Sequence, residues 1–192
     1  MMTSPAISRF AVPEFSALPE DIQTRITEIQ EKAGFIPNVF MALAHRPDEL
    51  RAFMAYHDAL ILHPSGLSKA EKEMIIVATS AKNDCLYCVV AHGAILRIYA
   101  KDSKISEQIA TDHTKADITD KQKAMLDFAI KTATNAAQIC EADLQLLRNN
   151  GFDDEDIWDI GAITALFALS NRMASMAAMR PNDEFYAMGR DF

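Results

Sequence analysis

Helix start and stop signals recur along the whole sequence, whereas the alternating β-branched runs typical of strands are absent. Glycine is scarce, with 6 residues, and proline is modest, with 7. Apolar residues return instead at intervals of three and four, which is the spacing of one helix face. The sequence therefore predicts an all-α fold, a multi-helix bundle.

Capping residues set the bounds of the expected helices. The clearest start is Ser68-Lys69-Ala70-Glu71, in which the serine and the glutamate form a capping-box pattern. Thr119 and Gln122 repeat that pattern, and Asp84 is well placed to cap a helix from Cys85 through Tyr99. The remaining helices are expected at about 19–33, 47–62, 106–112, 141–149 and 154–179.

The chain is expected to form one domain. Residues 1–17 are predicted to be an irregular N-terminal arm and residues 18–192 a single helical domain, with a break at Pro37-Asn38 and a redox core at about 47–100. One weak internal similarity aligns Leu67–Ala78 with Ile118–Ala129, and no cysteine pair follows the second copy. If the two helix starts derive from a duplication, only the first copy kept its chemistry.

Composition and charge disfavour several classes of partner. Hydrophobic residues make up 49% and charged residues 24%, as in an ordinary soluble protein. The net charge of −8 would repel a phosphate backbone, so we expect no nucleic-acid partner. The stretch between Asp159 and Arg172 is shorter than the roughly 20 residues of a membrane span, and no signal peptide is recognisable. The expected location is the cytoplasm.

The pattern that carries chemistry is Glu73 followed by Cys85-x2-Cys88-x3-His92. Each residue of an α-helix turns about 100°, so Cys85, Cys88 and His92 would share one helix face. Side chains three apart have Cβ atoms about 5–6 Å apart. A disulfide needs roughly 3.5–4.5 Å. Oxidation would therefore require the first turn to tighten, which is easiest at the start of a helix.

Three interpretations of the cysteine pair stay open on residue chemistry alone. The favoured one is a redox-active dithiol in which the helix N-terminus stabilises a thiolate at Cys85 most. The second is a zinc site with His92 as third ligand and Cys140, His57 or Glu73 as fourth. The third is a pair of inert buried cysteines.

Other candidate residues have simpler explanations. Glu73 by itself is more often a solvated helix residue, although it could relay a proton if the two helices fold back on each other. His57 lies on an apolar face and is expected to pack, and Cys140 is expected to be structural. Met173, Met176 and Met179 form a stripe typical of a core or of an oligomer interface. Together with the small-residue segment 161–170, the stripe favours a homo-oligomer.

These residues resemble the alkylhydroperoxidase D / carboxymuconolactone decarboxylase superfamily. The core is Glu73-x11-Cys85-x2-Cys88-x3-His92, on two consecutive helices opened by Leu67–Glu71. The flanks are similar to a subgroup of peroxidase-related proteins, and the likeness spans about residues 34–190. The flanking segments are Gly34–Phe40, Ser170–Ala174 and Pro181–Tyr186.

The resemblance implies an oligomeric helical enzyme that reduces hydrogen peroxide or alkyl hydroperoxides without a cofactor. It implies that Cys88 attacks the peroxide, that Cys85 resolves the sulfenic acid into a disulfide, and that Glu73 and His92 handle protons. The reductant would be a dithiol, of the dihydrolipoyl or thioredoxin-like kind. Alkylhydroperoxidases proper have a histidine between the cysteines where this chain has Tyr87, and the superfamily's decarboxylases lack the cysteine pair.

Two other functions remain as alternatives. One is a redox-switched binding or scaffold protein whose disulfide changes an oligomer interface without efficient peroxide turnover. The other is a zinc-stabilised helical module.

Overall fold

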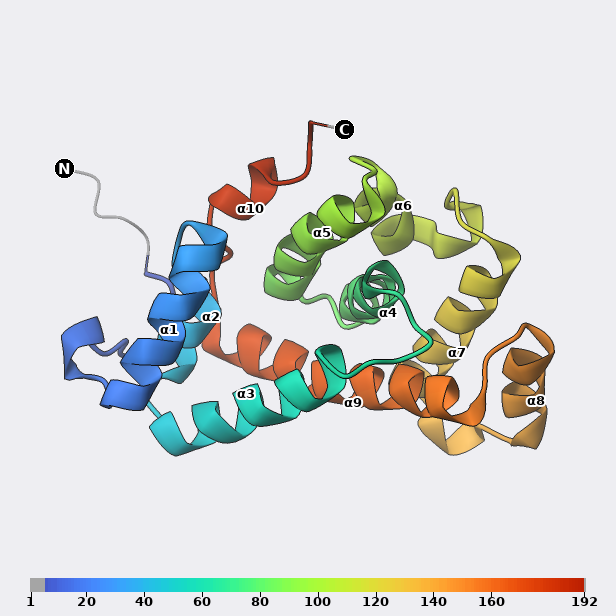
Figure 1. Ribbon diagram of the computed structural model, residues 1–192, viewed down its shortest axis with the longest axis horizontal. Helices are drawn as coiled ribbons and strands as arrows, with labels where there is room; N and C mark the ends of the chain where they lie inside the picture. The colour runs from blue at the N-terminus through green and yellow to red at the C-terminus, as the bar shows by residue number, and fades with distance from the viewer. Residues whose placement is uncertain (1–5, 192) are drawn as a thin grey trace.

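The computed structural model describes residues 6–191, and every regular element in that range is a helix (Figure 1). This confirms the all-α prediction. The α-helices are α1 (Glu20–Ala33), α2 (Asn38–Leu43), α3 (Pro47–Ile61), α4 (Lys69–Lys82), α5 (Leu86–Ala100), α6 (Ile105–Asp112), α7 (Asp120–Asn135), α8 (Glu141–Asn149), α9 (Asp154–Ala177) and α10 (Glu184–Ala187). Short 3₁₀ turns lie at Phe15–Ala17, His113–Lys115 and Ala136–Gln138.

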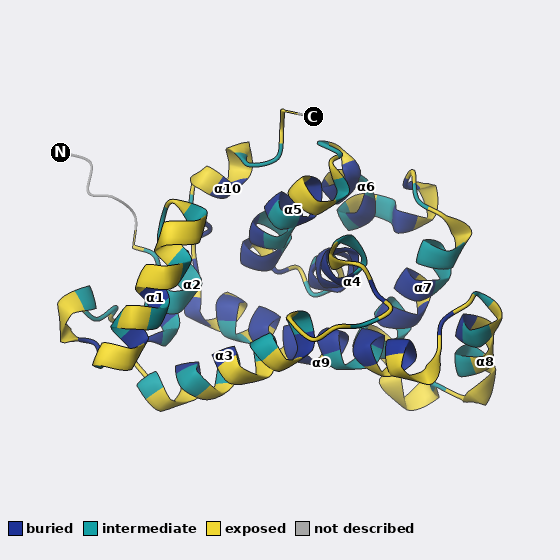
Figure 2. Cartoon of the chain, in the orientation of Figure 1, coloured by how far each residue is buried: buried dark blue, intermediate teal, exposed yellow. Residues whose placement is uncertain are grey.

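Helix α4 is the centre of the fold. Figure 1 shows it nearly end-on, with α5, α6, α7 and α9 packed around it. Every residue of α4 from Lys72 to Ser80 is buried, as the dark-blue ribbon in Figure 2 shows. A helix that is covered on all sides in this way needs apolar residues around its whole circumference. The run Met74–Ala78 supplies them.

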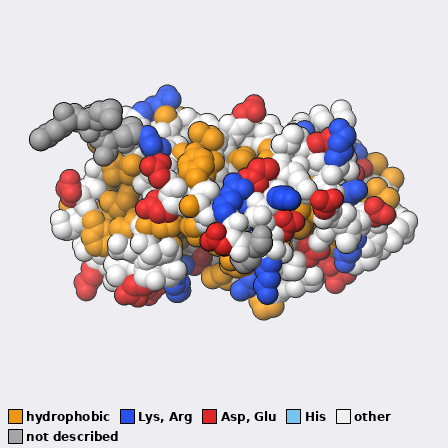
Figure 3. All heavy atoms as spheres, turned by 90° about the horizontal axis from the view of Figure 1, so that it is seen from above, with side chains coloured by type: hydrophobic (Ala, Val, Ile, Leu, Met, Phe, Trp, Pro, Cys, Tyr) orange, Lys and Arg blue, Asp and Glu red, His pale blue; other side chains and the backbone are white. Residues whose placement is uncertain are grey.

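A second layer covers one end of the long helix α9. Helices α1, α2 and α3 enclose their own small apolar cluster, which includes Ile22, Ile26 and Leu50. Helix α3 then lies along α9 (Figure 1). Seen from the side of α5 and α10, charged side chains of both signs are interspersed over the right half of the molecule, and apolar side chains gather toward the left (Figure 3).

Several sequence-based expectations are confirmed by the helix ends. Ser68 and Thr119 both form complete capping boxes, with Glu71 and Gln122 respectively. Helix α8 has the predicted bounds, and α1 ends at Gly34, whose φ of 85° is the left-handed conformation that glycine adopts without strain. Among residues 6–191, no helix is both long enough and apolar enough to cross a membrane.

Two expectations about local structure were wrong, and one helix was missed. The expected break before Asn38 is present, since α1 ends at Ala33 and Pro37 is not helical, but Pro37 is also the N-cap of the short helix α2, which the sequence did not predict. The methionine stripe is not one helix face. Helix α9 ends at Ala177, so Met179 lies beyond it and is buried, whereas Met176 is exposed. Asp84 is not the N-cap of α5, because Cys85 takes that position.

Candidate active site

The turn between α4 and α5 places the first cysteine. Asp84 has a φ of 51°, in the left-handed region, and turns the chain sharply at the end of α4. The Cys85 N–H donates to the Ser80 carbonyl at 3.0 Å, which closes that turn. The Cys85 carbonyl in turn accepts from the Val89 N–H at 3.0 Å, so Cys85 rather than Asp84 is the N-cap of α5.

This turn changes the relation between the two thiols. Cys85 has an extended backbone and precedes the helix, so the predicted common helix face holds for Cys88 and His92 and not for Cys85. Both cysteines are free thiols, with exposed fractions of 1% and 2%. Each thiol is the largest influence on the pKa of the other, so the two side chains lie close together. The two sulfurs therefore lie together in a buried site without tightening of the helix.

The two thiols differ in acidity. The pKa of Cys85 is lowered to about 6, because the Cys88 thiol donates to its sulfur and the Cys88 backbone N–H donates as well, against the opposing effect of burial. The pKa of Cys88 is raised above its usual range by the same hydrogen bond, by burial and by the negative charge on Cys85.

Glu73 and His92 form a buried pair that joins α4 to α5. The distance from Glu73 Oε2 to His92 Nδ1 is 2.8 Å, and only 5% of the Glu73 side chain is exposed. A carboxylate only accepts hydrogen bonds, so with Glu73 ionised the Nδ1 atom carries the proton and Nε2 remains the free basic nitrogen. Phe167 packs edge-on against the imidazole, with ring centroids 4.7 Å apart. The interpretation of Glu73 as a solvated residue was therefore wrong.

His92 stands one helical turn beyond Cys88, which brings the imidazole to the same face of α5 as that thiol. Glu73 contacts His92 and not the cysteines among the hydrogen bonds found in residues 6–191. The four residues singled out from the sequence, Glu73, Cys85, Cys88 and His92, are thus brought together where α4 meets α5.

The far wall of the site comes from α9, and the sequence did not predict its role. Ser170 Oγ lies 3.9 Å from Cys88 Sγ. Asn171 lowers the pKa of both thiols and donates from Nδ2 to Ser80 Oγ at 2.9 Å. Ser175 lowers the pKa of Cys85. These residues are more than eighty positions from the cysteines in the sequence. The sequence indicated Ser170 and Asn171 only as part of a flanking segment that resembles the family.

Tyr87, which lies between the two cysteines in sequence, has a packing role. Its hydroxyl accepts a hydrogen bond from the Val39 N–H at 3.1 Å, at the first turn of α2. Burial raises the pKa of the phenol above its usual range. Tyr87 therefore fastens α2 to α5 as a neutral side chain.

The other candidate residues lie elsewhere or have other partners. Cys140 is exposed at the N-cap of α8. His57 bonds to Asp58, and burial lowers the pKa of its imidazole. Within residues 6–191 there is no cluster of three or more His, Cys, Asp or Glu side chains suited to hold a metal ion. The zinc alternative thus lacks a ligand set in the described part of the chain.

Two cavities lie beside the thiol pair. One, of about 450 Å³, is lined by Cys85 itself, with Ser175, Ala178 and Arg180 among its other residues. The second, of about 360 Å³, lies between α3 and α9 and includes Ser170, the residue in contact with Cys88. The thiols are therefore nearly inaccessible to bulk water yet adjoin two openings.

An all-helical fold with a buried cysteine pair next to a glutamate–histidine pair defines a class of helical thiol proteins, and sequence and structure comparisons identify the family. Residues 47–111 match the carboxymuconolactone decarboxylase family. The comparison with curated proteins gave no match.

Solved structures extend the likeness to the whole chain. An uncharacterised peroxidase-related protein with an alkylhydroperoxidase AhpD core, from Ralstonia eutropha JMP134, is 62% identical, with a TM-score of 0.97 over 97% of this chain and 98% of that one. A peroxidase-related protein from Silicibacter sp. TM1040 is 41% identical, with a TM-score of 0.93 over 99% of this chain and 100% of that one. The chain belongs to the alkylhydroperoxidase AhpD / carboxymuconolactone decarboxylase superfamily, as its motifs predicted.

A more distant neighbour shows how widely the fold is used. The debrominase Bmp8, solved as a cysteine-to-alanine variant with 2,3,4-tribromopyrrole, is 17% identical, with a TM-score of 0.78 over 96% of this chain and 95% of that one. At that identity the likeness concerns the fold alone. The matched family and the 62% identical structure both carry the names of enzymes, a decarboxylase and an alkylhydroperoxidase, so an enzymatic role for this chain is supported in general terms.

Proposed function

We propose that this chain is a thiol peroxidase that reduces hydrogen peroxide or organic hydroperoxides through a Cys85/Cys88 dithiol–disulfide cycle. The observation that carries the proposal is a buried pair of free thiols with His92, held by Glu73, one helical turn beyond Cys88. A thiolate is the nucleophile that attacks peroxide oxygen, and a second thiol within bonding reach converts the sulfenic acid to a disulfide.

Acidity and surroundings single out different sulfurs. Cys85 has the lower pKa, whereas Cys88 contacts Ser170 and precedes His92 by one turn. The proton between the sulfurs needs only to shift toward Cys85 to leave a thiolate on Cys88. We therefore assign peroxide attack to Cys88 and resolution to Cys85.

The cycle balances as follows. The Cys88 thiolate attacks the terminal peroxide oxygen, the O–O bond breaks, and the alkoxide takes a proton and leaves as an alcohol. Cys85 then attacks the Cys88 sulfenic acid, and water leaves as the S–S bond forms. The two protons come from the thiol pair and from solution, and His92 held by Glu73 is suited to pass them. A dithiol of the dihydrolipoyl or thioredoxin-like kind returns the electrons.

The proposal is tested by steady-state peroxide consumption with dihydrolipoamide or a thioredoxin as the electron donor. We expect turnover together with a mass loss of two hydrogens in protein trapped without reductant, mapped to Cys85 and Cys88. A disulfide that forms without turnover would instead support the redox-switched scaffold. Thiols that stay reduced under excess peroxide would overturn both the peroxidase and the redox-switched scaffold. Incubation with 2,3,4-tribromopyrrole, the compound bound to the debrominase variant, tests separately for a thiol reaction other than peroxide reduction.

Assembly and location are parts of the same proposal. Helix α9 exposes Trp158, Leu169 and Met176, with exposed fractions of 72%, 54% and 48%, and this apolar side favours a homo-oligomer. A monomeric mass in sedimentation at micromolar concentration would contradict it. A cycle driven by cellular dithiols fits the reducing conditions of the cytoplasm.

A further inference from the structure

Asn171 is a buried polar side chain on the side of α9 that packs against the thiol pair. Its exposed fraction is 1%, and it directly follows Ser170, whose hydroxyl lies 3.9 Å from Cys88 Sγ. Ala174, three residues further along α9, packs in the same apolar cluster as both cysteines. Residues three apart on a helix are neighbours on its surface. Asn171 therefore belongs to the wall of the thiol site.

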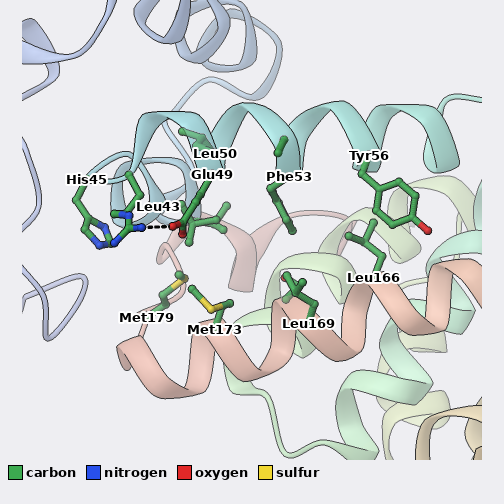
Figure 4. Close-up of a pocket in the computed structure, with 14 residues that line it drawn as sticks. Leu43, His45, Glu49, Leu50, Phe53, Tyr56, Leu166, Leu169, Met173 and Met179 are labelled. Atoms are coloured by element: carbon green, nitrogen blue, oxygen red, sulfur yellow. Dashed lines mark ion pairs between the residues drawn. The ribbon is translucent and has the colours of Figure 1, made fainter.

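The opposite side of this stretch of α9 lines the cavity between α3 and α9. Figure 4 shows Leu166, Leu169 and Met173 pointing from α9 into that space. Asn171 is not among the residues that line the cavity. A molecule held there would contact the neighbouring Ser170 and not the Asn171 amide. The amide is thus placed to act on the sulfurs and not on a bound molecule.

Two hydrogen bonds to the end of α4 fix the orientation of the Asn171 amide. Its Oδ1 accepts from Asn83 Nδ2 at 2.9 Å, and its Nδ2 donates to Ser80 Oγ at 2.9 Å. The Ser80 carbonyl also accepts the Cys85 N–H, so one residue holds both the amide and the backbone of the first cysteine. An amide nitrogen carries two N–H groups, and Ser80 takes one of them. The second N–H remains for the thiol pair.

Asn171 differs from the two serines of the site because it affects both thiols. It lowers the pKa of Cys85 and also the pKa of Cys88. Ser175, by contrast, lowers the pKa of the first thiol, and Ser170 lowers that of the second. In the proposed cycle the negative charge lies on one sulfur at rest and on the other during attack. A fixed donor that serves both sulfurs does not have to reorganise when the charge moves.

We propose that Asn171 is the hydrogen-bond donor that keeps one negative charge on the thiol pair, on Cys85 at rest and on Cys88 during attack on the peroxide. The inference rests on the proposed peroxidase function and adds a charge-stabilising residue to it. The Asn171 amide forms no covalent bond and transfers no proton. It lowers the free energy of the thiolate relative to the thiol, so it sets the pH above which the pair is reactive.

The titratable groups around the thiol pair come from three elements. Glu73 of α4 and His92 of α5 bind each other at 2.8 Å. Asp84 and Arg180, of opposite charge, line the cavity that reaches the first thiol. Tyr87 is buried, and its raised pKa keeps the phenol neutral. The groups that lower the pKa of the first thiol most are uncharged donors, so the loss of one such donor should be visible in a titration.

The test is a titration of thiolate absorbance at 240 nm in the Cys140→Ser protein, which lacks the exposed third cysteine. The transition near pH 6 should move upward by about one pH unit in Asn171→Ala, the usual effect of losing a hydrogen bond to a charged group. At pH 6 the thiolate fraction would then fall from about one half to about one tenth. The initial rate of disulfide formation with hydrogen peroxide should fall about fivefold at that pH.

Ser80→Ala is the matched control, because it removes the same hydrogen bond between α4 and α9 but leaves the Asn171 amide in place. Both variants should lose a similar amount of stability in urea unfolding, and only Asn171→Ala should move the transition. Equal upward shifts in the two variants would mean that Asn171 only holds the helices together, which overturns the proposal. An unmoved transition in folded Asn171→Ala would overturn it as well.

Asn171→Asp provides a second variant if Asn171→Ala does not fold. It keeps the shape of the side chain and an acceptor for Asn83 Nδ2, but it removes both N–H donors and adds a negative charge. The transition should therefore move upward at least as far as in Asn171→Ala. A transition that stays near pH 6 in folded Asn171→Asp would refute the inference.

The two measurements separate this inference from the proposed function. The titration needs no peroxide, so it decides whether Asn171 holds the charge even if the wild-type protein consumes no peroxide, a result that would refute the peroxidase function alone. A shifted titration with an unchanged rate of disulfide formation would instead overturn the part of Asn171 in peroxide attack.

Discussion

Two helices of this protein begin immediately after a cysteine, and the two cysteines lie in different surroundings, one buried and one exposed. Cys85 is the N-cap of α5 and Cys140 is the N-cap of α8. The helices that precede them along the chain, α4 and α7, both open with a capping box. The comparison isolates what a helix N-terminus contributes to a thiol and what it does not.

The difference lies in the residue three positions later and in burial. At α5 that residue is Cys88, whose thiol is the main cause of the lowered pKa of Cys85 in a buried site. At α8 it is Asp143, whose carboxylate instead accepts from the Cys140 backbone N–H at 2.8 Å, and Cys140 is exposed. A helix terminus alone therefore does not make a reactive dithiol. A second sulfur and exclusion of water are needed as well.

The largest effect is expected from removing the attacking sulfur. Cys88→Ser should abolish peroxide consumption, because a hydroxyl is a poor nucleophile toward peroxide oxygen. Cys140→Ser, the matched change at the other N-cap, should leave turnover unchanged. Mass spectrometry after one equivalent of cumene hydroperoxide measures the oxidation directly. Accumulation of sulfenic acid on Cys85 in Cys88→Ser, with Cys85→Ser inert, would reverse the roles that we assign.

Removing the other sulfur should stop the cycle after one event. Cys85→Ser leaves Cys88 able to react once, and the resulting sulfenic acid finds no thiol within reach, because Cys140 lies on another helix. We expect one equivalent of peroxide consumed, followed by over-oxidation. A sulfenic-acid probe and intact mass measure this outcome. Sustained turnover in Cys85→Ser would show that an external thiol resolves Cys88 and that Cys85 is dispensable.

The buried carboxylate is expected to matter for rate and not for disulfide formation. Glu73→Gln removes the group that fixes the His92 tautomer and should lower kcat by about 10²–10⁴-fold, the usual contribution of a positioned acid or base. Asp127→Asn is the matched control, because Asp127 pairs with His113 at 2.7 Å far along the chain from the cysteines. Equal losses in the two variants would indicate a general structural effect.

The acidity of Cys85 is expected to depend on its neighbour. Thiolate absorbance at 240 nm should show a transition near pH 6 in the Cys140→Ser protein, in which only the pair titrates. Because the neighbouring Cys88 thiol lowers that pKa, the additional substitution Cys88→Ala, which leaves no side-chain donor, should move the transition upward, toward the ordinary cysteine value of about 8.5. A midpoint that does not move would assign the acidity to the helix terminus alone.

The parts of this site that the sequence predicted are those that depend on local spacing. The capping boxes at Ser68 and Thr119 and the shared face of Cys88 and His92 follow from neighbours within four residues. The burial of Glu73 does not, because it is set by how α4 is surrounded by other helices. The contact between Cys88 and Ser170 joins positions 82 residues apart and depends on the packing of α5 against α9.

The junction at Asp84 shows why a local rule failed. Aspartate is a favoured N-cap, and the sequence places it directly before Cys85. The chain instead turns through a left-handed Asp84, because the Cys85 N–H closes onto the end of α4. Asp84 could have capped the start of α5, but it instead belongs to the turn that ends α4, and Cys85 is the N-cap of α5.

The smallest expected effect concerns the two capping boxes. Its measurement tests whether the caps of α4 and α7 stabilise the protein independently of each other. Ser68→Ala and Thr119→Ala should each lower the free energy of unfolding by about 1 kcal/mol, the usual cost of losing such a cap. The boxes are linked, however, since Gln122 Nε2 lies 3.4 Å from Glu71 Oε1. Either substitution releases one side of that contact, so both single variants include its loss. The double variant should therefore cost less than the sum, by up to about 0.5 kcal/mol. Urea unfolding of the four proteins measures the difference, and strict additivity would show that α4 and α7 are capped independently.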